Sequence, residues 1–221
     1  MHIEPGIVAG AKIVLSYATA ATAGLYSLKL AFGALRDRGL TALAARTSLA
    51  TAATFVFFQV LPTAPVGVSE VHLILGSTLF LLFGAAPAAI GLALGLLIQG
   101  VAFAPADLPQ YGMNVTTLLV PLFAVAALAR RIIAPGTAYV DLSYAQALAL
   151  STAFQGGIVA WVAFWAFYGQ GAEAWGGIAA FGTAYLLVIA LEPLVDLAVL
   201  AGAKSLRGLR GSALVTPRLF A

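Results

Sequence analysis

The chain has 221 residues, of which 62% are hydrophobic and only 9% are charged. An average soluble domain carries about 25% charged residues, and a soluble protein of this size could not keep so much apolar surface away from water. The composition therefore excludes a soluble globular enzyme, a disordered protein and a nucleic-acid-binding protein. It predicts a single polytopic membrane domain over residues 1–221, embedded in a lipid bilayer.

Seven apolar segments follow one another between charged or Pro/Gly-rich breaks. Their approximate bounds are 7–34, 42–61, 72–86, 87–104, 113–133, 143–168 and 175–203. A bilayer-spanning helix needs about 20 residues, so we expect an all-α integral membrane protein with seven transmembrane helices. The third and fourth segments are short and almost directly joined, so they could instead form one broken hairpin buried among the others.

Basic residues mark one side of this arrangement. Nine of the eleven Lys and Arg residues lie in loops that seven spans place on the same face, namely Arg36, Arg38, Arg46, Arg130, Arg131, Lys204, Arg207, Arg210 and Arg218. The opposite loops contain no Lys or Arg, and their charged residues are all acidic, namely Glu4, Glu70, Asp107 and Glu173. Because short cytoplasmic loops collect Lys and Arg, we expect the N-terminus outside and the C-terminus in the cytoplasm.

The only two histidines, His2 and His72, both fall at the outer face in this topology. The first six residues contain no Lys or Arg, unlike a signal peptide, so we expect Met1 and His2 to be retained. A free α-amine, the amide nitrogen of residue 2 and the His2 imidazole can chelate one metal in a plane, and His72 would add a fourth nitrogen. Such a site suits Ni(II) or Cu(II) and can hold Co(II). The alternative is that the two histidines lie on the same face by chance and bind no metal.

Ionisable residues also occur within the apolar segments. Glu192 and Asp196 are four residues apart and share a helix face in the last segment, while Lys29 lies in the first. We expect these three residues to form an intramembrane ion pair that holds two helices together. A proton or coupling role is the alternative, because charged groups at membrane depth are costly. The chain contains neither a phosphate-binding loop nor a hydrolase motif, so we expect no enzymatic activity.

The start Met1-His2-Ile3 with Gly6, and the loop Gly67-Val68-Ser69-Glu70-Val71-His72-Leu73, resemble a known family. This is the CbiM/NikM family, the cobalt- and nickel-specific substrate-binding (S) components of energy-coupling factor (ECF) transporters. The run from Leu97 to Asn114 resembles the segment that ends in the family's Asn-bearing loop. The resemblance covers about residues 1–120.

The resemblance implies a four-nitrogen metal site in which the N-terminal segment 1–6 packs into the bundle. Its ligands would be the Met1 amine, the amide and imidazole nitrogens of His2, and His72. Asn114, the single Asn of the chain, would support the site by a hydrogen bond to the N-terminal segment. Glu70 could draw in cations or replace a ligand, or be an ordinary loop carboxylate.

The resemblance also implies the biological setting. The transported substrate would be Co(II) or Ni(II), with no organic cofactor, in the bacterial inner membrane. A transmembrane coupling (T) subunit, cytoplasmic ATPase subunits and, in some members, a small accessory membrane subunit would be partners. Two alternatives remain open: an ECF S component for an organic vitamin, whose cavity Trp161, Trp165 and Trp175 could line, or a structural membrane subunit without a ligand.

Overall fold

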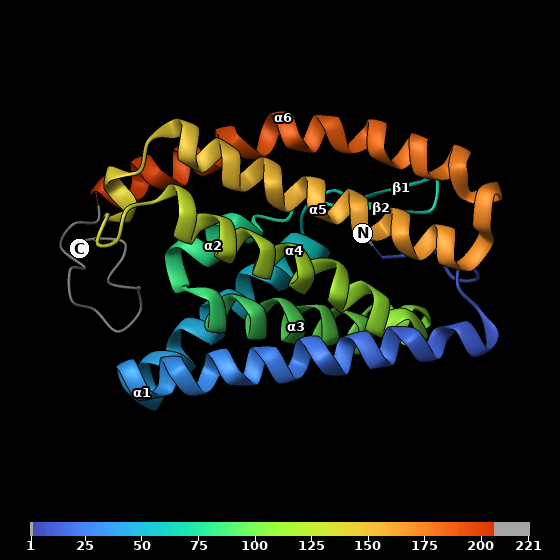
Figure 1. The fold of residues 1–221 in the computed structure, drawn as a ribbon, viewed down its shortest axis with the longest axis horizontal. Helices are drawn as coiled ribbons and strands as arrows, with labels where there is room; N and C mark the ends of the chain where they lie inside the picture. The colour runs from blue at the N-terminus through green and yellow to red at the C-terminus, as the bar shows by residue number, and fades with distance from the viewer. Residues whose placement is uncertain (1, 206–221) are drawn as a thin grey trace.

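Helices make up most of the protein. The structure, a computed structural model, describes residues 2–205. Its helices are α1 (Ile13–Gln59), α2 (Gly76–Phe83), α3 (Ala85–Ala102), α4 (Tyr111–Ile132), α5 (Tyr144–Gln170) and α6 (Trp175–Ser205), and Figure 1 shows their arrangement. Within these residues, a 3-10 turn at Gly10–Lys12 leads into α1, and three others connect later helices, at Pro105–Gln110, Tyr139–Asp141 and Gly171–Ala174. A hairpin of two short strands, β1 (Ala64–Val66) and β2 (Ser69–Val71), lies between α1 and α2.

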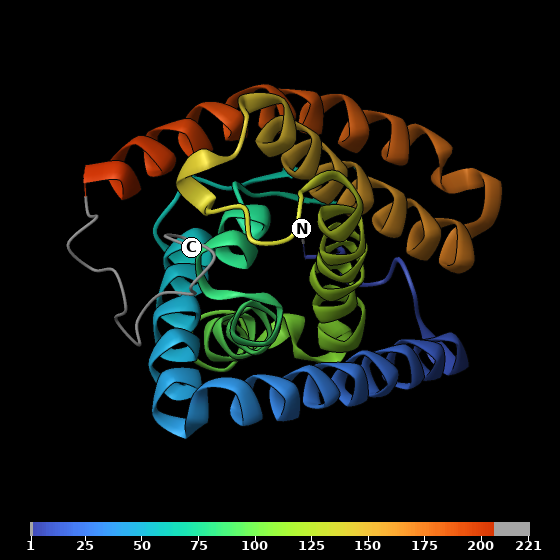
Figure 2. The same cartoon turned by 60° about the vertical axis from the view of Figure 1, so that its left-hand side comes forward.

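Helix α1 consists of two arms that meet at Gly39. The φ and ψ angles of Gly39 are 77° and 170°, outside the helical region. A positive φ is readily adopted by glycine because it has no Cβ. The chain turns sharply at this residue, as Figure 2 shows, so residues 13–38 and 40–59 form two arms with different directions. These arms correspond to the first two predicted segments.

Helix α2 is short and buried. It has eight residues, which gives a length of about 12 Å at 1.5 Å per residue. The apolar interior of a bilayer is about 30 Å thick, so α2 alone cannot cross it. Gly84, with a φ of 91°, separates α2 from α3. The structure therefore does not give this region two full spans, because only α3 is long enough to cross by itself.

Long apolar stretches confirm a multi-pass helical membrane protein. Within residues 2–205, four stretches are long and apolar enough to cross a membrane, namely Gly10–Gln59, Ala85–Ala102, Pro105–Ile132 and Tyr144–Ala203. The first contains both arms of α1, and the last contains α5 and α6. The number of crossings and the side on which each terminus lies stay predictions.

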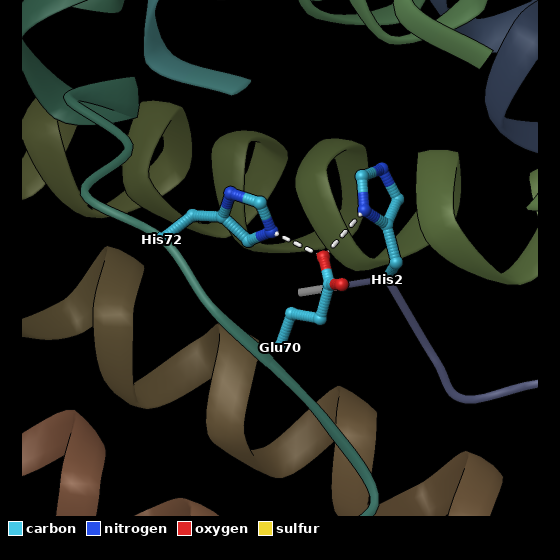
Figure 3. Close-up of side chains that lie close together, drawn as sticks. All are labelled: His2, Glu70 and His72. Carbon is cyan, nitrogen blue, oxygen red and sulfur yellow. Dashed lines mark hydrogen bonds and ion pairs between the residues drawn. The ribbon is translucent and has the colours of Figure 1, made fainter. Parts of the chain in front are cut away.

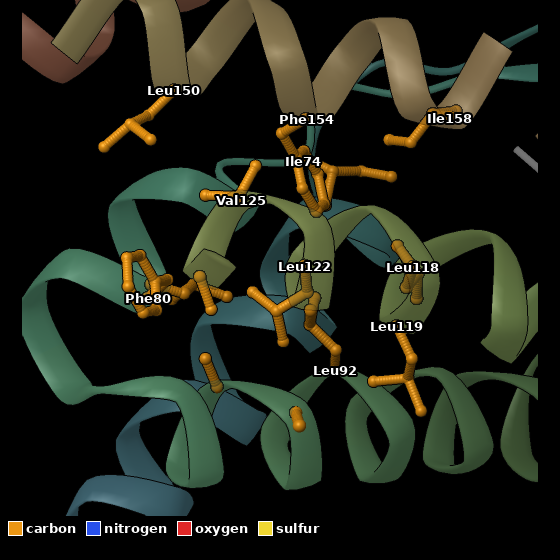
Figure 4. Packing of buried hydrophobic residues seen from close by; sticks show 14 of the residues in the cluster. Ile74, Phe80, Leu92, Leu118, Leu119, Leu122, Val125, Leu150, Phe154 and Ile158 are labelled. Atoms are coloured by element: carbon orange, nitrogen blue, oxygen red, sulfur yellow. The ribbon is translucent and has the colours of Figure 1, made fainter. Parts of the chain in front are cut away.

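Helix α4 lies in the middle of the bundle. Leu118, Leu122 and Val125 of α4 are fully buried, and Figure 4 shows them between Leu92 of α3 and Phe154 of α5. The helices α5 and α6 cover one side of α4, and the first arm of α1 runs along the opposite side of the molecule (Figures 1 and 2). Because α4 is central, its first turn is held in place and can support a segment that packs against it.

Helix α3 packs closely on the second arm of α1. A Cβ added at Gly91 would lie 2.4 Å from the Cβ of Ala50, and one added at Gly95 would lie 2.6 Å from the Cβ of Thr54. Small residues let helix backbones approach each other in a membrane. The close contact between these two helices therefore depends on glycine at both positions.

We expect the substitution Gly91→Ala to destabilise the protein by about 1–3 kcal/mol, the usual cost of overpacking. Gly33→Ala is the matched control, because Gly33 is also helical and an added Cβ there meets nothing within 4 Å. In the control, the better helix propensity of alanine should leave stability unchanged or raise it by up to about 1 kcal/mol. Thermal unfolding in detergent measures both. Equal melting temperatures for the two variants would contradict the packing argument.

Candidate metal site

The β1–β2 hairpin carries two of the candidate site residues. Its strands pair in antiparallel register, with Ala64 opposite Val71 and Val66 opposite Ser69. The turn contains Gly67, whose φ is 63°, and a Cβ at this position would lie 2.1 Å from the carbonyl oxygen of Gly177 in α6. Only glycine fits so close to α6. The hairpin, which the sequence analysis did not predict, is thereby held against the bundle.

The N-terminal segment pairs with β2 as a further short extended strand. Ile3 forms an antiparallel bridge with Ser69. The Glu4 N–H donates to the Val68 carbonyl (3.2 Å), and the Glu70 N–H donates to the His2 carbonyl (3.1 Å). The Ser69 hydroxyl donates to the same His2 carbonyl (2.9 Å). These hydrogen bonds place His2 beside Glu70, although 67 residues separate the two along the chain.

Asn114, in the first turn of α4, also holds the N-terminal segment. The Ile3 N–H donates to the Asn114 Oδ1 atom at 2.9 Å, and each residue is only 1% exposed. Ile3 packs in the same region with Val8, Met113 and Trp165. The predicted contact between Asn114 and the N-terminal segment is present. Its importance for metal binding stays a prediction.

Both histidines converge on one carboxylate oxygen. The Glu70 Oε2 atom lies 2.9 Å from His2 Nδ1 and 2.9 Å from His72 Nε2, as Figure 3 shows. The ligand atoms of these three residues all lie within 4.8 Å of one another. Both imidazoles are buried, and the ring of Phe58 lies against them, with centroid distances of 5.4 Å to His2 and 4.9 Å to His72. The site therefore has an apolar wall and a compact set of donor atoms.

The surroundings of the site favour a neutral His72 and an ionised Glu70. Hydrogen bonds from His2 and then His72 hold the pKa of Glu70 well below its usual range. Burial lowers the pKa of His72 to about 3. His2 Nε2 and His72 Nδ1 are buried without a hydrogen-bond partner. At neutral pH, Glu70 and His72 are thus already in the deprotonated forms that bind metals.

The distances fit a metal-ligand set. Ligand atoms about 2.05 Å from a metal and at right angles to each other are about 2.9 Å apart, the separation that Glu70 Oε2 makes with each imidazole nitrogen. Two imidazole nitrogens and one carboxylate oxygen suit a first-row divalent metal. The Asp107 Oδ2 atom lies 3.7 Å from His2 Nδ1 and adds negative charge near the site.

Sequence reasoning located part of this site. The structure brings His2 and His72 together at Glu70, which had been left between two interpretations, and places Asn114 against the N-terminal segment, whereas metal binding by these residues stays a prediction. Phe58 and Asp107 were missed. The pattern of acidic residues in the outer loops was the available signal for Asp107. Met1 lies outside the described residues.

The predicted ion pair of Lys29 with Glu192 and Asp196 is not formed. Lys29 is exposed on the first arm of α1, whereas Glu192 and Asp196 are buried on α6. The two helices lie on opposite sides of the molecule (Figures 1 and 2). All ion pairs within residues 2–205 instead involve His2 or His72.

We expect Asn114→Ala to loosen the N-terminal segment, because it leaves the buried Ile3 N–H without a partner. Such a loss costs about 1–3 kcal/mol. Hydrogen exchange of the backbone amides of residues 3–4 and 69–70 should accelerate. Asn114→Asp, which keeps an oxygen acceptor, should retain slower exchange. The same exchange rates in Asn114→Ala and the unaltered protein would contradict the role of this bond.

The comparison with known families identifies one family. A family described as CbiM, cobalt uptake substrate-specific transmembrane region, matches residues 2–208. No curated protein and no solved structure matches the chain. The matched range includes His2, Glu70, His72 and Asn114 and nearly the whole bundle. The chain therefore belongs to the CbiM family, a family of membrane components for cobalt uptake.

Proposed function

We propose that this protein is the substrate-binding subunit of an ECF-type ABC transporter, and that it captures Co(II) at His2, Glu70 and His72. The observation that carries the proposal is the convergence of the chain's two histidines on one carboxylate oxygen. Cobalt uptake by the family supplies the substrate. The acidic residues near the site attract a cation, and the apolar wall shields its ligands from water.

The N-terminal amine and the His2 amide nitrogen complete the proposed ligand set. The nitrogen of His2 that faces Glu70 is Nδ1. This is the ring nitrogen that can close a small chelate ring with the amide nitrogen of the same residue. In the part of the chain that the structure describes, no backbone hydrogen bond uses the His2 N–H. Both observations support a chelate that starts at the amine of Met1.

Charge balance supports Glu70 as a ligand or close neighbour of the metal. A deprotonated amide and an ionised Glu70 each carry one negative charge, so together they neutralise a divalent cation. Burial of a neutral complex avoids the large cost of an uncompensated charge. An oxygen ligand added to four nitrogens also raises the coordination number. That favours Co(II) over Ni(II), which is suited to a planar four-ligand site.

Uptake against a gradient requires an energy source, and this chain has no phosphate-binding motif with which to use ATP. We propose that a transmembrane coupling subunit and cytoplasmic ATPase subunits supply it, with the metal site facing outside. A small accessory membrane subunit is a further proposed partner. We place this protein in the bacterial inner membrane.

We expect His2→Ala and His72→Ala each to weaken Co(II) binding more than about 100-fold, because each removes a ligand rather than a supporting group. Glu70→Gln keeps the size of the side chain but removes its charge, and should weaken binding by about 10–100-fold. Calorimetric titration of purified protein measures all three variants.

Glu173→Gln is the matched control, since Glu173 is an exposed carboxylate in the turn before α6. It should bind Co(II) like the unaltered protein. Undiminished affinity in both histidine variants would refute the site.

The pH dependence of binding identifies the additional ligands. Because the pKa of His72 is lowered to about 3 and that of Glu70 lies below its usual range, neither takes up protons between pH 6 and pH 8. Protons released on Co(II) binding in this window must come from the other proposed ligands, which are the amine, the amide and the His2 imidazole. We expect release of at least about one proton, because the amide binds a metal only after it loses its proton, and affinity that falls as the pH falls. Calorimetry in buffers of different ionisation enthalpy counts them, and no release with pH-independent affinity would contradict the chelate.

A further inference from the structure

A second polar cluster lies inside the bundle, between α2, α5 and α6. Glu192 and Asp196 of α6 are 0% and 6% exposed. The Ser77 hydroxyl at the start of α2 lies 3.5 Å from an oxygen of each carboxyl group. The Thr78 hydroxyl donates to Asp196, and the Gln155 amide of α5 donates to Glu192 and to the Ile74 carbonyl. Polar side chains from three helices therefore meet in an apolar surrounding.

No basic side chain balances these two acids. Within residues 2–205, no ion pair includes Glu192 or Asp196. Two adjacent ionised carboxylates in a low-dielectric interior are costly. The pair therefore requires a bound cation or protons.

Two further buried oxygens near the acids lack a hydrogen-bond partner. They are the Gln155 Oε1 atom, on the amide whose nitrogen contacts Glu192, and the Ser151 Oγ atom. Gln155 is 0% exposed and Ser151 is 1% exposed. Ser151 lies one helical turn before Gln155, and its hydroxyl interacts with both carboxyl groups without reaching ordinary hydrogen-bond geometry. Buried polar atoms are nearly always satisfied, so the unpartnered Gln155 oxygen and this loosely held hydroxyl beside two carboxyl groups point to a ligand that coordinates oxygen.

A short piece of chain connects this cluster to the metal site of His2, Glu70 and His72. Residues 72–78 begin at His72, pass through the Ile74 carbonyl that Gln155 contacts, and end at Ser77 and Thr78. On α6, the Tyr185 hydroxyl donates to the His72 carbonyl at 3.5 Å. Tyr185, Glu192 and Asp196 are seven and four residues apart, so they share one helix face. Polar groups thus continue from the metal site into the bundle.

We propose that this cluster is a second cation site, which holds the divalent metal after it leaves the first site. Its oxygen donors come from Ser77, Thr78, Ser151, Gln155, Glu192 and Asp196. Two carboxylates neutralise a divalent cation, and oxygen ligands hold Co(II) less tightly than imidazole and amide nitrogens do. A weaker site that lies deeper in the bundle than a stronger one suits transport of the ion, because an ion in transit must also be released. The identity of the ion as the transported metal rests on the proposed function, whereas the existence of the site does not.

Mn(II) is a selective probe for this cluster, because Mn(II) prefers oxygen ligands. The experiment uses the full chain with His2→Ala and His72→Ala, which disable the first site, and follows Mn(II) by electron paramagnetic resonance. We expect about one Mn(II) per chain, with no coupling to histidine nitrogen. Adding E192Q and D196N to this protein should weaken Mn(II) binding about tenfold or more, since both charges are lost.

Ser151→Ala gives a milder test that does not alter a charge. The Ser151 hydroxyl makes no hydrogen bond of ordinary geometry, so its removal should not lower the melting temperature. If the hydroxyl is a ligand, Mn(II) affinity falls severalfold. Ser27→Ala is the matched control, because the buried Ser27 hydroxyl donates to Ala23 within the first arm of α1. The control should leave Mn(II) affinity unchanged.

Equal Mn(II) affinity with and without E192Q and D196N, or Mn(II) bound to nitrogen, would overturn the proposal. So would absence of Mn(II) binding in the protein that retains both acids, since the cluster would then carry only protons. The nitrogen-coupling measurement uses protein with both acids intact, so the result does not depend on the folding of the acid variants. If the unaltered protein does not bind Co(II) tightly but the cluster still binds Mn(II), the proposed function is refuted and this second site is not.

Discussion

The pairing of the N-terminal segment with β2 is the interaction on which the site depends. Backbone hydrogen bonds join His2 and Glu4 to the stretch Val68–Glu70, and Asn114 holds Ile3 from the other side. Without this pairing, His2 would be a residue of a free terminus, and His72 and Glu70 would form an incomplete site on a hairpin. With it, donor atoms from opposite ends of a long stretch of sequence come within ligand distance of one another.

The bundle provides fixed supports for this pairing. The turn at Gly67 lets the hairpin pack closely against α6, and Asn114 of the central helix α4 binds the Ile3 N–H. The surrounding apolar residues exclude water, which keeps His72 neutral while its hydrogen bonds keep Glu70 ionised. Packing and electrostatics thus favour the same state, an ionised Glu70 and a neutral His72 ring, which can bind a cation without a net loss of protons from these two side chains.

The sequence predicted the helical segments because membrane spans are long apolar runs between charged breaks, and residue type alone shows them. The two histidines were found because they are scarce in this chain, whereas Asn114 was found through the family resemblance. The hairpin was not predicted, since three-residue strands leave almost no periodic signal. The central position of Glu70 depends on the hairpin register, which only tertiary packing sets.

The error over Lys29 has a similar cause. Opposite charges in two apolar segments suggest a pair, but pairing requires the helices to be neighbours, and the order of helices in space cannot be read from their order in the chain. The α6 acids instead face α2 and α5, where hydroxyl and amide groups surround them. Their partners are uncharged side chains, which a search for opposite charges passes over.

The central claim is that the N-terminus of this chain takes part in binding the metal. The most direct test is Co(II) titration of the purified protein with its N-terminus at Met1, beside a copy with one residue added before Met1. We expect tight binding of one Co(II) by the first protein and loss of that binding in the second, because the added residue moves the amine away from the His2 amide. Equal binding by both proteins, or binding by neither, would contradict it.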